Sequence, residues 1–289
     1  MDASFYLIQF LNGIQYGFLL FLVAAGLTLV FGIMGIINLA HGSFYMIGAY
    51  LAFWLTNLTG NFLIGVALAI PVTIGIGYLV ERTTFSRLYS RGHLHQVLLT
   101  YALILIFDEL QLILWGNDFH GIDVPEFLSG AIQLTDILSY PTYRLFISAI
   151  CIVLAFMMYW VIQKTKLGMM IRAGASNREM VQILGIDVQR LFAIIFSLGV
   201  ALAALAGMLA APVTSVYPGM GENILIISFV VAVIGGIGSI KGAFVGALLV
   251  GLVDIYGKTL FPELASILVY ALMVVVLLWR PQGLFGTAA

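Results

Sequence analysis

The chain has 289 residues, of which 62% are hydrophobic and only 9% are charged, and its formal net charge is −1. A soluble domain carries roughly a quarter of charged residues, so this composition excludes a water-exposed globular domain and makes lipid the solvent. The small net charge gives no electrostatic basis for binding nucleic acid. One crossing takes about 20 apolar residues, so the sequence predicts a single all-α polytopic membrane domain over 1–289, with about 8–9 transmembrane helices.

Long apolar runs place these helices along the chain. In order, we expect them near residues 8–32, 34–56, 61–81, 97–115, 143–162, 190–212, 223–236, 241–256 and 264–279. Two neighbouring pairs are separated by only a few glycine-rich positions, from Gly32 to Gly35 and from Gly235 to Gly242. At these two places we expect broken helices, with the chain turning inside the membrane instead of reaching water.

The distribution of Lys and Arg predicts the orientation, because these residues accumulate on the cytoplasmic side of membrane proteins. Basic residues cluster over 82–91 and over 164–190, whereas the segment 116–143 carries several acidic residues and no Lys or Arg. We therefore expect a cytoplasmic loop at about 164–189 and an outward loop at about 116–143. The N-terminus would lie outside if nine helices cross, and inside if one glycine-rich pair forms a single broken element.

Glycines four residues apart predict a close helix contact late in the chain. Gly238, Gly242 and Gly246 would form a smooth helix face, and small residues at this spacing let helices approach closely. This face would serve either tight packing within the subunit or a moving or paired interface. The stretch 42–51 also resembles 242–249, which leaves open an internal repeat of the kind found in transporters.

Polar residues inside the apolar runs are candidates for function, because a polar group in the bilayer needs a partner or a cavity. Asn38 and His41 would either bond to neighbouring helices or line a substrate path near the first break. The path residues expected from the two breaks are Asn38, His41, Gly42, Gly235 and Gly236.

Adjacent carboxylates at Asp108 and Glu109 are a second polar feature of the apolar runs. Interface packing or a pairing with Arg144 is favoured over an ion-coupling site, although both interpretations stay open. His93 and His95 have the spacing of a ligand pair without a third ligand nearby, so no metal site is expected.

The cytoplasmic segment 165–187 contains a predicted docking helix. Ser176 and Glu179 have the spacing of a capping box, and the helix they would open runs over 180–184 and stops at Gly185. Such a short amphipathic helix needs a partner for its apolar stripe, either the bilayer surface or a groove on another protein.

This segment resembles the coupling loop of ABC importer permeases, in particular those of the branched-chain amino-acid (LivH-like) type. The residues that carry the resemblance, and the expected ATPase-coupling set, are Arg172, Ala173, Ala175, Ser176, Glu179, Leu184, Gly185 and Ile186. Further stretches that resemble this family lie at 35–50, 81–91, 235–242 and 280–285.

The resemblance implies that the chain is a transport subunit of the bacterial inner membrane and not an enzyme. It implies a second related permease subunit in a heterodimer, two cytoplasmic ATPase subunits and a periplasmic substrate-binding protein. ATP and Mg would be bound by the ATPase partners, with no cofactor on this chain, and the sequence contains no Walker-type phosphate-binding motif.

The sequence therefore predicts an ATP-driven importer of amino acids or similar small organic solutes, in which closure of the ATPases drives alternating access. The alternatives are an ion-coupled secondary transporter and a channel for small solutes. Ser43 stands where the family often carries an acid, so the substrate stays open among branched-chain and other amino acids, amides or urea, and aromatic acids.

Overall fold

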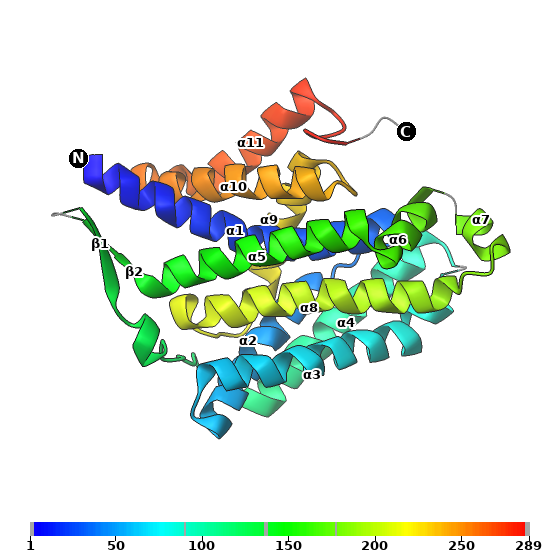
Figure 1. Cartoon of the computed structure of the whole chain (residues 1–289), viewed down its shortest axis with the longest axis horizontal. Helices are drawn as coiled ribbons and strands as arrows, with labels where there is room; N and C mark the ends of the chain where they lie inside the picture. Colours follow the sequence, from blue (N-terminus) through cyan, green and yellow to red (C-terminus); the bar gives the residue numbers. More distant parts are fainter. Residues whose placement is uncertain (1–2, 90, 136–137, 177, 287–289) are drawn as a thin grey trace.

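A computed structural model describes residues 3–89, 91–135, 138–176 and 178–286, and most of its helices run along the longest axis of the molecule (Figure 1). The long helices are α1 (Ala3–Met34), α2 (His41–Thr59), α3 (Phe62–Thr83), α4 (His93–Trp115), α5 (Thr142–Lys164), α8 (Val188–Thr214), α9 (Met220–Gly235), α10 (Ile240–Leu260) and α11 (Ala265–Trp279). The shorter elements are α6 (Lys166–Ser176), α7 (Arg178–Ile183), strands β1 (Ala131–Thr135) and β2 (Leu138–Pro141), and the 3-10 turns η1 (Phe85–Arg87), η2 (Glu126–Leu128) and η3 (Pro262–Leu264).

Each apolar run expected from the sequence corresponds to one long helix, so the predicted all-α polytopic fold is confirmed. In the described part of the chain, seven helices are long and apolar enough to cross a membrane, and α2 and α9 are outside that group. α9 has 16 residues, or about 24 Å, which is less than the roughly 30 Å of a hydrocarbon core. The structure adds a small antiparallel hairpin of β1 and β2 within the segment expected to be an outward loop.

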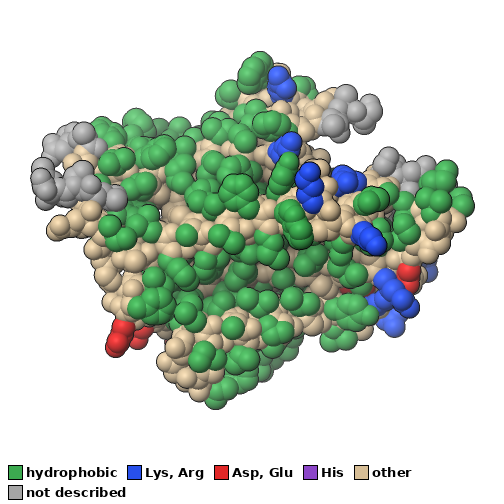
Figure 2. All heavy atoms as spheres, in the orientation of Figure 1, with side chains coloured by type: hydrophobic (Ala, Val, Ile, Leu, Met, Phe, Trp, Pro, Cys, Tyr) green, Lys and Arg blue, Asp and Glu red, His purple; other side chains and the backbone are tan. Residues whose placement is uncertain are grey.

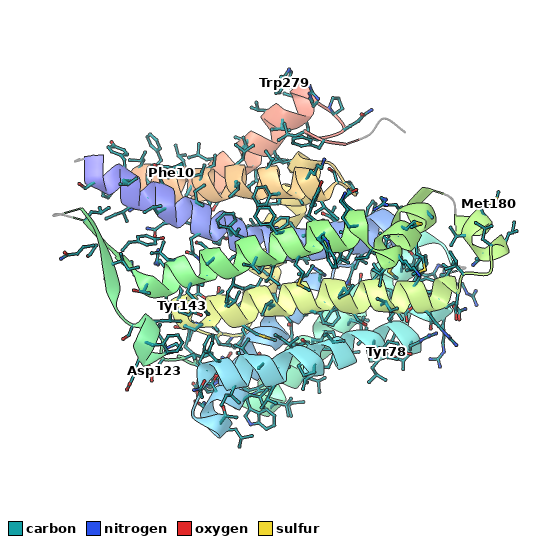
Figure 3. The ribbon with its side chains drawn as sticks, viewed as in Figure 1. Phe10, Tyr78, Asp123, Tyr143, Met180 and Trp279 are labelled. Atoms are coloured by element: carbon teal, nitrogen blue, oxygen red, sulfur yellow. The ribbon has the colours of Figure 1, made fainter. Side chains whose placement is uncertain are left out.

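Lys and Arg side chains gather at the end of the molecule where α6 and α7 lie, and a band of hydrophobic side chains separates this end from the other (Figure 2). We call this the basic end; Met180 lies there (Figure 3). The opposite, acidic end carries Asp123 and the hairpin. Among the Lys and Arg side chains that the structure describes, only Arg144 and Lys258 lie at the acidic end. α1 begins at the acidic end (Figure 1), on the same side as the hairpin.

The chain breaks between α1 and α2, and the connecting segment runs back into the bundle. His41, at the start of α2, donates a hydrogen bond from Nε2 to the carbonyl oxygen of Val23 at 3.0 Å. Val23 lies eleven residues before the end of α1 at Met34, a distance of about 16 Å along a helix. Residues 35–40 are therefore re-entrant, and α2 begins later than the run near 34–56 suggested.

The first four and the last four long helices share a packing pattern. α1 packs against α10 while α8 packs against α3, and α2 and α9 each pack against the first helix of the other set. α1 and α8 meet at Gly26 and Gly199, and the starts of α2 and α9 meet at Gly42 and Gly221. Because α1 and α8 run in opposite directions (Figure 1), helices α1–α4 and α8–α11 form a repeat of inverted topology. The resemblance of 42–51 to 242–249 would pair α2 with α10 and does not mark this repeat.

The two crossings are contacts of backbone with backbone. A Cβ atom on Gly221 would lie 2.7 Å from the carbonyl oxygen of Gly42, and one on Gly26 would lie 2.6 Å from that of Gly199. Lipid supplies no hydrophobic force between helices, so close van der Waals packing of small residues stabilises them instead. The starts of α2 and α9 are thereby fixed inside the bundle.

Of the three glycines expected to form one face of a helix, only two lie on α10. α10 begins at Ile240, and Gly238 lies before it in a turn with φ of +84°, a conformation that glycine adopts without strain. Gly238 is therefore not on the helix, which corrects the expectation. Gly242 and Gly246 are on α10 and pack against Gly235 of α9.

At the acidic end, the hairpin and α5 are tied to α1 through one amide. The Tyr140 hydroxyl of β2 donates to Oδ1 of Asn12 at 3.1 Å, and Arg144 of α5 donates from Nη1 to the same oxygen. Burial raises the pKa of the Tyr140 hydroxyl, with the neighbouring Arg144 opposing this shift. The hydroxyl therefore stays protonated near neutral pH and remains a donor.

Gly207→Ala should destabilise the bundle, because its Cβ atom would lie 2.9 Å from the Tyr45 carbonyl carbon and closer still to its oxygen. Overpacking of this kind costs about 1–3 kcal/mol of unfolding free energy, measurable by denaturant titration in detergent. Gly75→Ala is the matched control, since nothing lies within 4 Å of its Cβ position, and helix propensity predicts a gain of up to about 1 kcal/mol. Equal stability of the two variants would contradict the packing described.

Asn12→Ala should lower the unfolding free energy by about 1–3 kcal/mol, because Tyr140 and Arg144 both lose their acceptor. Asp187→Asn serves as the comparison: its ion pair with Arg190 is exposed, and such pairs contribute at most about 1 kcal/mol. The same titration measures both variants, and a larger loss in Asp187→Asn would refute this ranking.

Candidate functional site

The segment 165–187 at the basic end consists of α6, α7 and a turn. α6, which the sequence did not predict, packs against three long helices: Ile171 clusters with Leu29 of α1, Ile162 of α5 and Leu191 of α8. Arg172 also donates a hydrogen bond from Nη1 to the Ile162 carbonyl oxygen at the end of α5. Movement of α6 would therefore act on three long helices together.

A short helix lies where the sequence predicts one. α7 begins at Arg178, and the chain turns after it at Gly185, where φ is +80°. The backbone of Ser176 belongs to the last turn of α6. The side chains of Ser176 and Glu179, the expected capping box, lie outside the described residues.

Apolar side chains of α7 and its following turn are exposed. Ile183 is 78% and Leu184 71% exposed, whereas Val181 on the same helix is buried against the bundle. Ala173 and Ala175 of α6 are exposed as well. We call these four exposed residues the docking face: Ala173, Ala175, Ile183 and Leu184. Of the other expected coupling residues with described side chains, Arg172 and Gly185 are exposed and Ile186 is partly buried.

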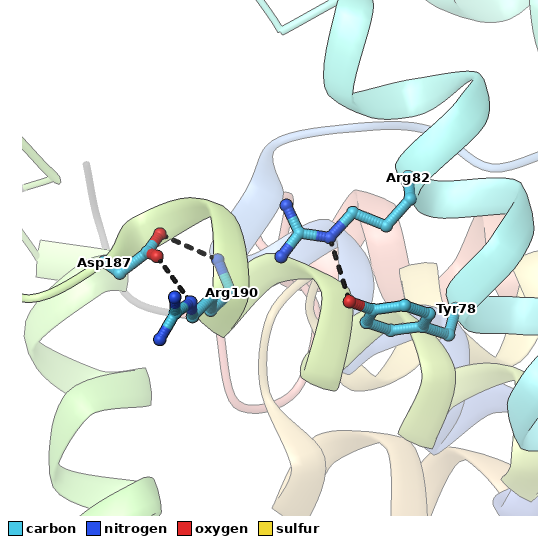
Figure 4. A network of polar contacts seen from close by, with 4 residues as sticks. All are labelled: Tyr78, Arg82, Asp187 and Arg190. Carbon is cyan, nitrogen blue, oxygen red and sulfur yellow. Dashed lines mark hydrogen bonds and ion pairs between the residues drawn. The ribbon is translucent and has the colours of Figure 1, made fainter.

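Charged groups lie where α3 ends and α8 begins (Figure 4). Asp187 caps α8 by accepting a hydrogen bond from the Arg190 backbone N–H at 3.0 Å, and its carboxylate lies 2.9 Å from Arg190 Nε. Arg82 of α3 donates from Nε to the Tyr78 hydroxyl at 3.3 Å. Two arginines from separate helices thus stand beside the segment 165–187.

The first part of the expected substrate path is buried in the re-entrant break. Asn38 and His41 have no exposed surface, and Asn38 Oδ1 accepts a hydrogen bond from the Ala40 backbone N–H at 3.1 Å. Asn38 Nδ2 and His41 Nδ1 make no hydrogen bond within the described residues. Gly42 packs directly on Gly221.

The second part of the expected path lies elsewhere, at the other end of α9. Gly235 is fourteen residues from Gly221 along this helix, about 21 Å. The C-terminal tail covers this end, since the Phe285 backbone N–H donates to the Gly235 carbonyl oxygen at 3.0 Å. Gly236, with φ of +99°, turns against the same tail. The structure therefore brings the glycine-rich turn to the tail and not to Asn38.

A cavity of about 550 Å³ opens at the acidic end, and the sequence did not indicate it. Its wall comes from α1, α2, α5, α8, α9, α10 and α11. The polar and charged lining includes Asn12, Gln15, Tyr16, Tyr45, Arg144, Tyr217, Asn223, Asp254 and Lys258.

An ion pair stands in the cavity wall. Lys258 Nζ lies 2.6 Å from Asp254 Oδ2, one turn apart on α10. Lys258 also lies over the Tyr16 ring, 5.7 Å from its centre. Asp254 falls within the apolar run expected over 241–256. A lone acid there, four residues before a lysine on a helix, is the sequence feature that could have predicted this ion pair.

The remaining candidates form no site in the described residues. Asp108 is partly buried and Glu109 is exposed, and no ion pair joins either to Arg144, whose described partner is Asn12. Among the described residues, no three His, Cys, Asp or Glu side chains are placed to hold a metal ion.

Comparison with known proteins identifies the family. The model of a family described as branched-chain amino acid transport system / permease component matches residues 9–277. The high-affinity branched-chain amino acid transport system permease protein BraD of Pseudomonas aeruginosa is 33% identical over 97% of this chain and 96% of its own length. LivH of Escherichia coli is 29% identical over 98% of this chain and 96% of its own length. The ribose import permease RbsC of Bacillus subtilis is 28% identical over 80% of this chain and 70% of its own length. No solved structure matches.

The family and the fold agree. Its members are transport components and not enzymes. Together with the seven described helices that are long and apolar enough to cross a membrane, the family makes this chain a multi-pass protein of the bacterial inner membrane. A permease component works with the other components of its transport system. The chain belongs to the branched-chain amino acid type of permease subunits of ABC importers.

Proposed function

We propose that the chain pairs with a second, related permease subunit, and that two cytoplasmic ATPases, which bind ATP and Mg, drive the pair. A periplasmic binding protein would deliver the solute to the acidic end. In this proposal 1–289 is one permease domain, with the cytoplasmic loop at about 164–189 and the outward loop at about 116–143. The observation that carries the proposal is the exposed apolar docking face at the end of the molecule rich in Lys and Arg.

The docking face suits a groove on another protein. Ile183 and Leu184 are exposed, and α7 lies at the extreme of the basic end (Figure 1). If the Lys and Arg side chains sit at the cytoplasmic headgroups, α7 projects past them into water. An amphipathic helix that lays apolar side chains into a groove is a common mode of docking, and Met180, one turn before Leu184, is exposed as well. The coupling set therefore includes these residues with Arg172, Ala173, Ala175, Ser176, Glu179, Gly185 and Ile186.

Closure of the ATPases would act on the bundle through α6. Because α6 is packed against α1, α5 and α8, a displacement of the docking face moves these helices. α1 and α8 carry the crossing at Gly26 and Gly199. Their rearrangement would open and close the path past the starts of α2 and α9. We propose that Asn38, His41 and Gly42 hold that re-entrant start in place beside the path.

The solute is an amino acid with an apolar side chain in this proposal. Several relatives carry the words branched-chain amino acid in their names, and the cavity combines charged groups with aliphatic ones such as Leu19 and Ile224.

Leu184→Asp should weaken binding of the ATPase about tenfold or more, because an apolar anchor lost from a groove costs over 1 kcal/mol. Co-purification of the ATPase with the permease, and ATP-driven uptake into vesicles, measure the effect. Phe127→Asp is the matched control, since Phe127 is equally exposed but lies in η2 at the acidic end. Full ATPase binding by Leu184→Asp would end the assignment of the docking face.

Glu179→Arg should separate ATP hydrolysis from uptake, because it reverses a charge within the coupling helix while leaving membrane insertion intact. ATP hydrolysis and uptake are measured on the same vesicles. Normal uptake by this variant would refute the coupling role of α7.

A further inference from the structure

The cavity at the acidic end has the size of a binding site for a small molecule. Its volume of about 550 Å³ lies within the range of roughly 300–1,000 Å³ that small-molecule sites occupy. Arg144, Thr214 and Lys258, at the acidic-end termini of three helices, line its mouth. Tyr45 and Met220 line its depth, next to the crossing of Gly42 with Gly221. The cavity therefore opens outward and ends where α2 and α9 begin.

Asp254 is the unusual group in the wall. It is only 4% exposed, and burying a carboxylate is costly unless a partner neutralises it. The partner in the structure is Lys258, whose side chain is 58% exposed. A long, solvent-reaching lysine is a partner that a ligand can displace, because its ammonium group loses little on returning to water. An ionisable residue held inside a membrane protein in this way marks a functional site.

The rest of the wall is divided between hydrogen-bonding and aliphatic groups. The side chains of Gln15, Tyr16 and Tyr45 line the cavity and make no hydrogen bond to another described residue, so their polar atoms are available to a ligand. Leu19 and Val269 are buried aliphatic residues of the same wall. A ligand that fits must carry charge at one end and apolar surface at the other.

We propose that this cavity binds the transported solute within this single subunit, and that the solute is a zwitterionic amino acid with an aliphatic side chain. Its ammonium group takes the place of Lys258 beside Asp254, and its carboxylate pairs with the released Lys258. Two opposite charges one helical turn apart match the two charges of a zwitterion. The aliphatic side chain then lies against Leu19 and Val269. This inference rests on the proposed function and adds the place where the solute waits before the path opens.

Cysteine labelling tests occupancy without relying on transport. Asn223 lines the cavity, and the single native cysteine, Cys151, is buried. In the assembled transporter, a membrane-impermeant maleimide added from outside should label Asn223→Cys. Protection grows as one plus the ratio of ligand to Kd, so leucine at several times Kd should slow labelling about fivefold. 4-Methylpentanoate, which lacks the ammonium group, should not slow it. Asp123→Cys, in the outward segment, should be labelled at the same rate with and without leucine.

Uptake by charge variants tests the role of Asp254. Asp254→Asn should lower leucine uptake roughly 30-fold or more, because a charge pair desolvated in a site is lost. Glu263→Gln, which changes an exposed acid of η3 at the same end that does not line the cavity, should transport normally. Asn223→Trp should also block uptake, because the larger side chain fills the cavity. Since it leaves the ion pair of Asp254 and Lys258 intact, it tests the cavity even if Asp254→Asn fails to fold. Leu249→Trp on α10, outside the cavity, is its control.

These experiments distinguish a failure of the proposed function from a failure of the cavity site. Absence of ATP-dependent leucine uptake by the unchanged transporter would refute the proposed function itself. Normal uptake by that transporter, with leucine giving no protection of Asn223→Cys, would overturn the cavity site alone. Equal protection by leucine and 4-methylpentanoate would overturn the pairing of Asp254 with the ammonium group.

Discussion

Contact between glycine backbones in the middle of the bundle is the constraint on which the rest of the structure depends. Gly26 with Gly199, and Gly42 with Gly221, bring helices closer than any side chain would allow. Lipid does not press helices together, so small residues that permit close van der Waals packing do so instead. These contacts hold the re-entrant segment 35–40 and the short helix α9 within the bundle. Without them, two helices could not begin at the depth where the cavity ends.

The basic residues are distributed unevenly between the two ends of the bundle. Most described basic side chains lie at one end, as expected for residues facing the cytoplasm, whereas Arg144 and Lys258 stand at the other end and both line the cavity. A basic residue against this trend needs a local reason. In the structure that reason is a polar partner, Asn12 for Arg144 and Asp254 for Lys258. The exceptions to the charge pattern therefore point to the cavity.

Hydropathy predicted the existence and order of the long helices, because a lipid-facing or buried helix must be apolar whatever it packs against. It misplaced the start of α2, since Ile36 and Ile37 are as apolar outside a helix as in one. The backbone there is satisfied locally, with Asn38 accepting from Ala40, which no hydropathy value reports. The same limit applies to Gly238, whose spacing fits a helix although its φ does not.

The short helix α7 was predictable, because an amphipathic stretch between basic clusters has a distinctive composition. Its anchor α6 was not, since the contacts of Ile171 with Leu29 and Leu191 join residues far apart in the chain. The cavity was missed for a similar reason. Tyr16, Tyr45 and Asp254 come from three helices, and only the folded packing brings them to one space. The polar residues that stand out in the sequence near the first break, Asn38 and His41, are instead fully buried.

In the proposed mechanism, a separate ATPase drives solute through this bundle by acting on the segment 165–187. The most direct measurement is leucine uptake into sealed vesicles that contain the chain with its second permease, ATPases and binding protein, with either ATP or an ion gradient as the energy source. The account predicts uptake that requires ATP and the ATPases and is unaffected when the gradients of Na⁺ and H⁺ are collapsed. Uptake that persists without ATP and follows an ion gradient would contradict it.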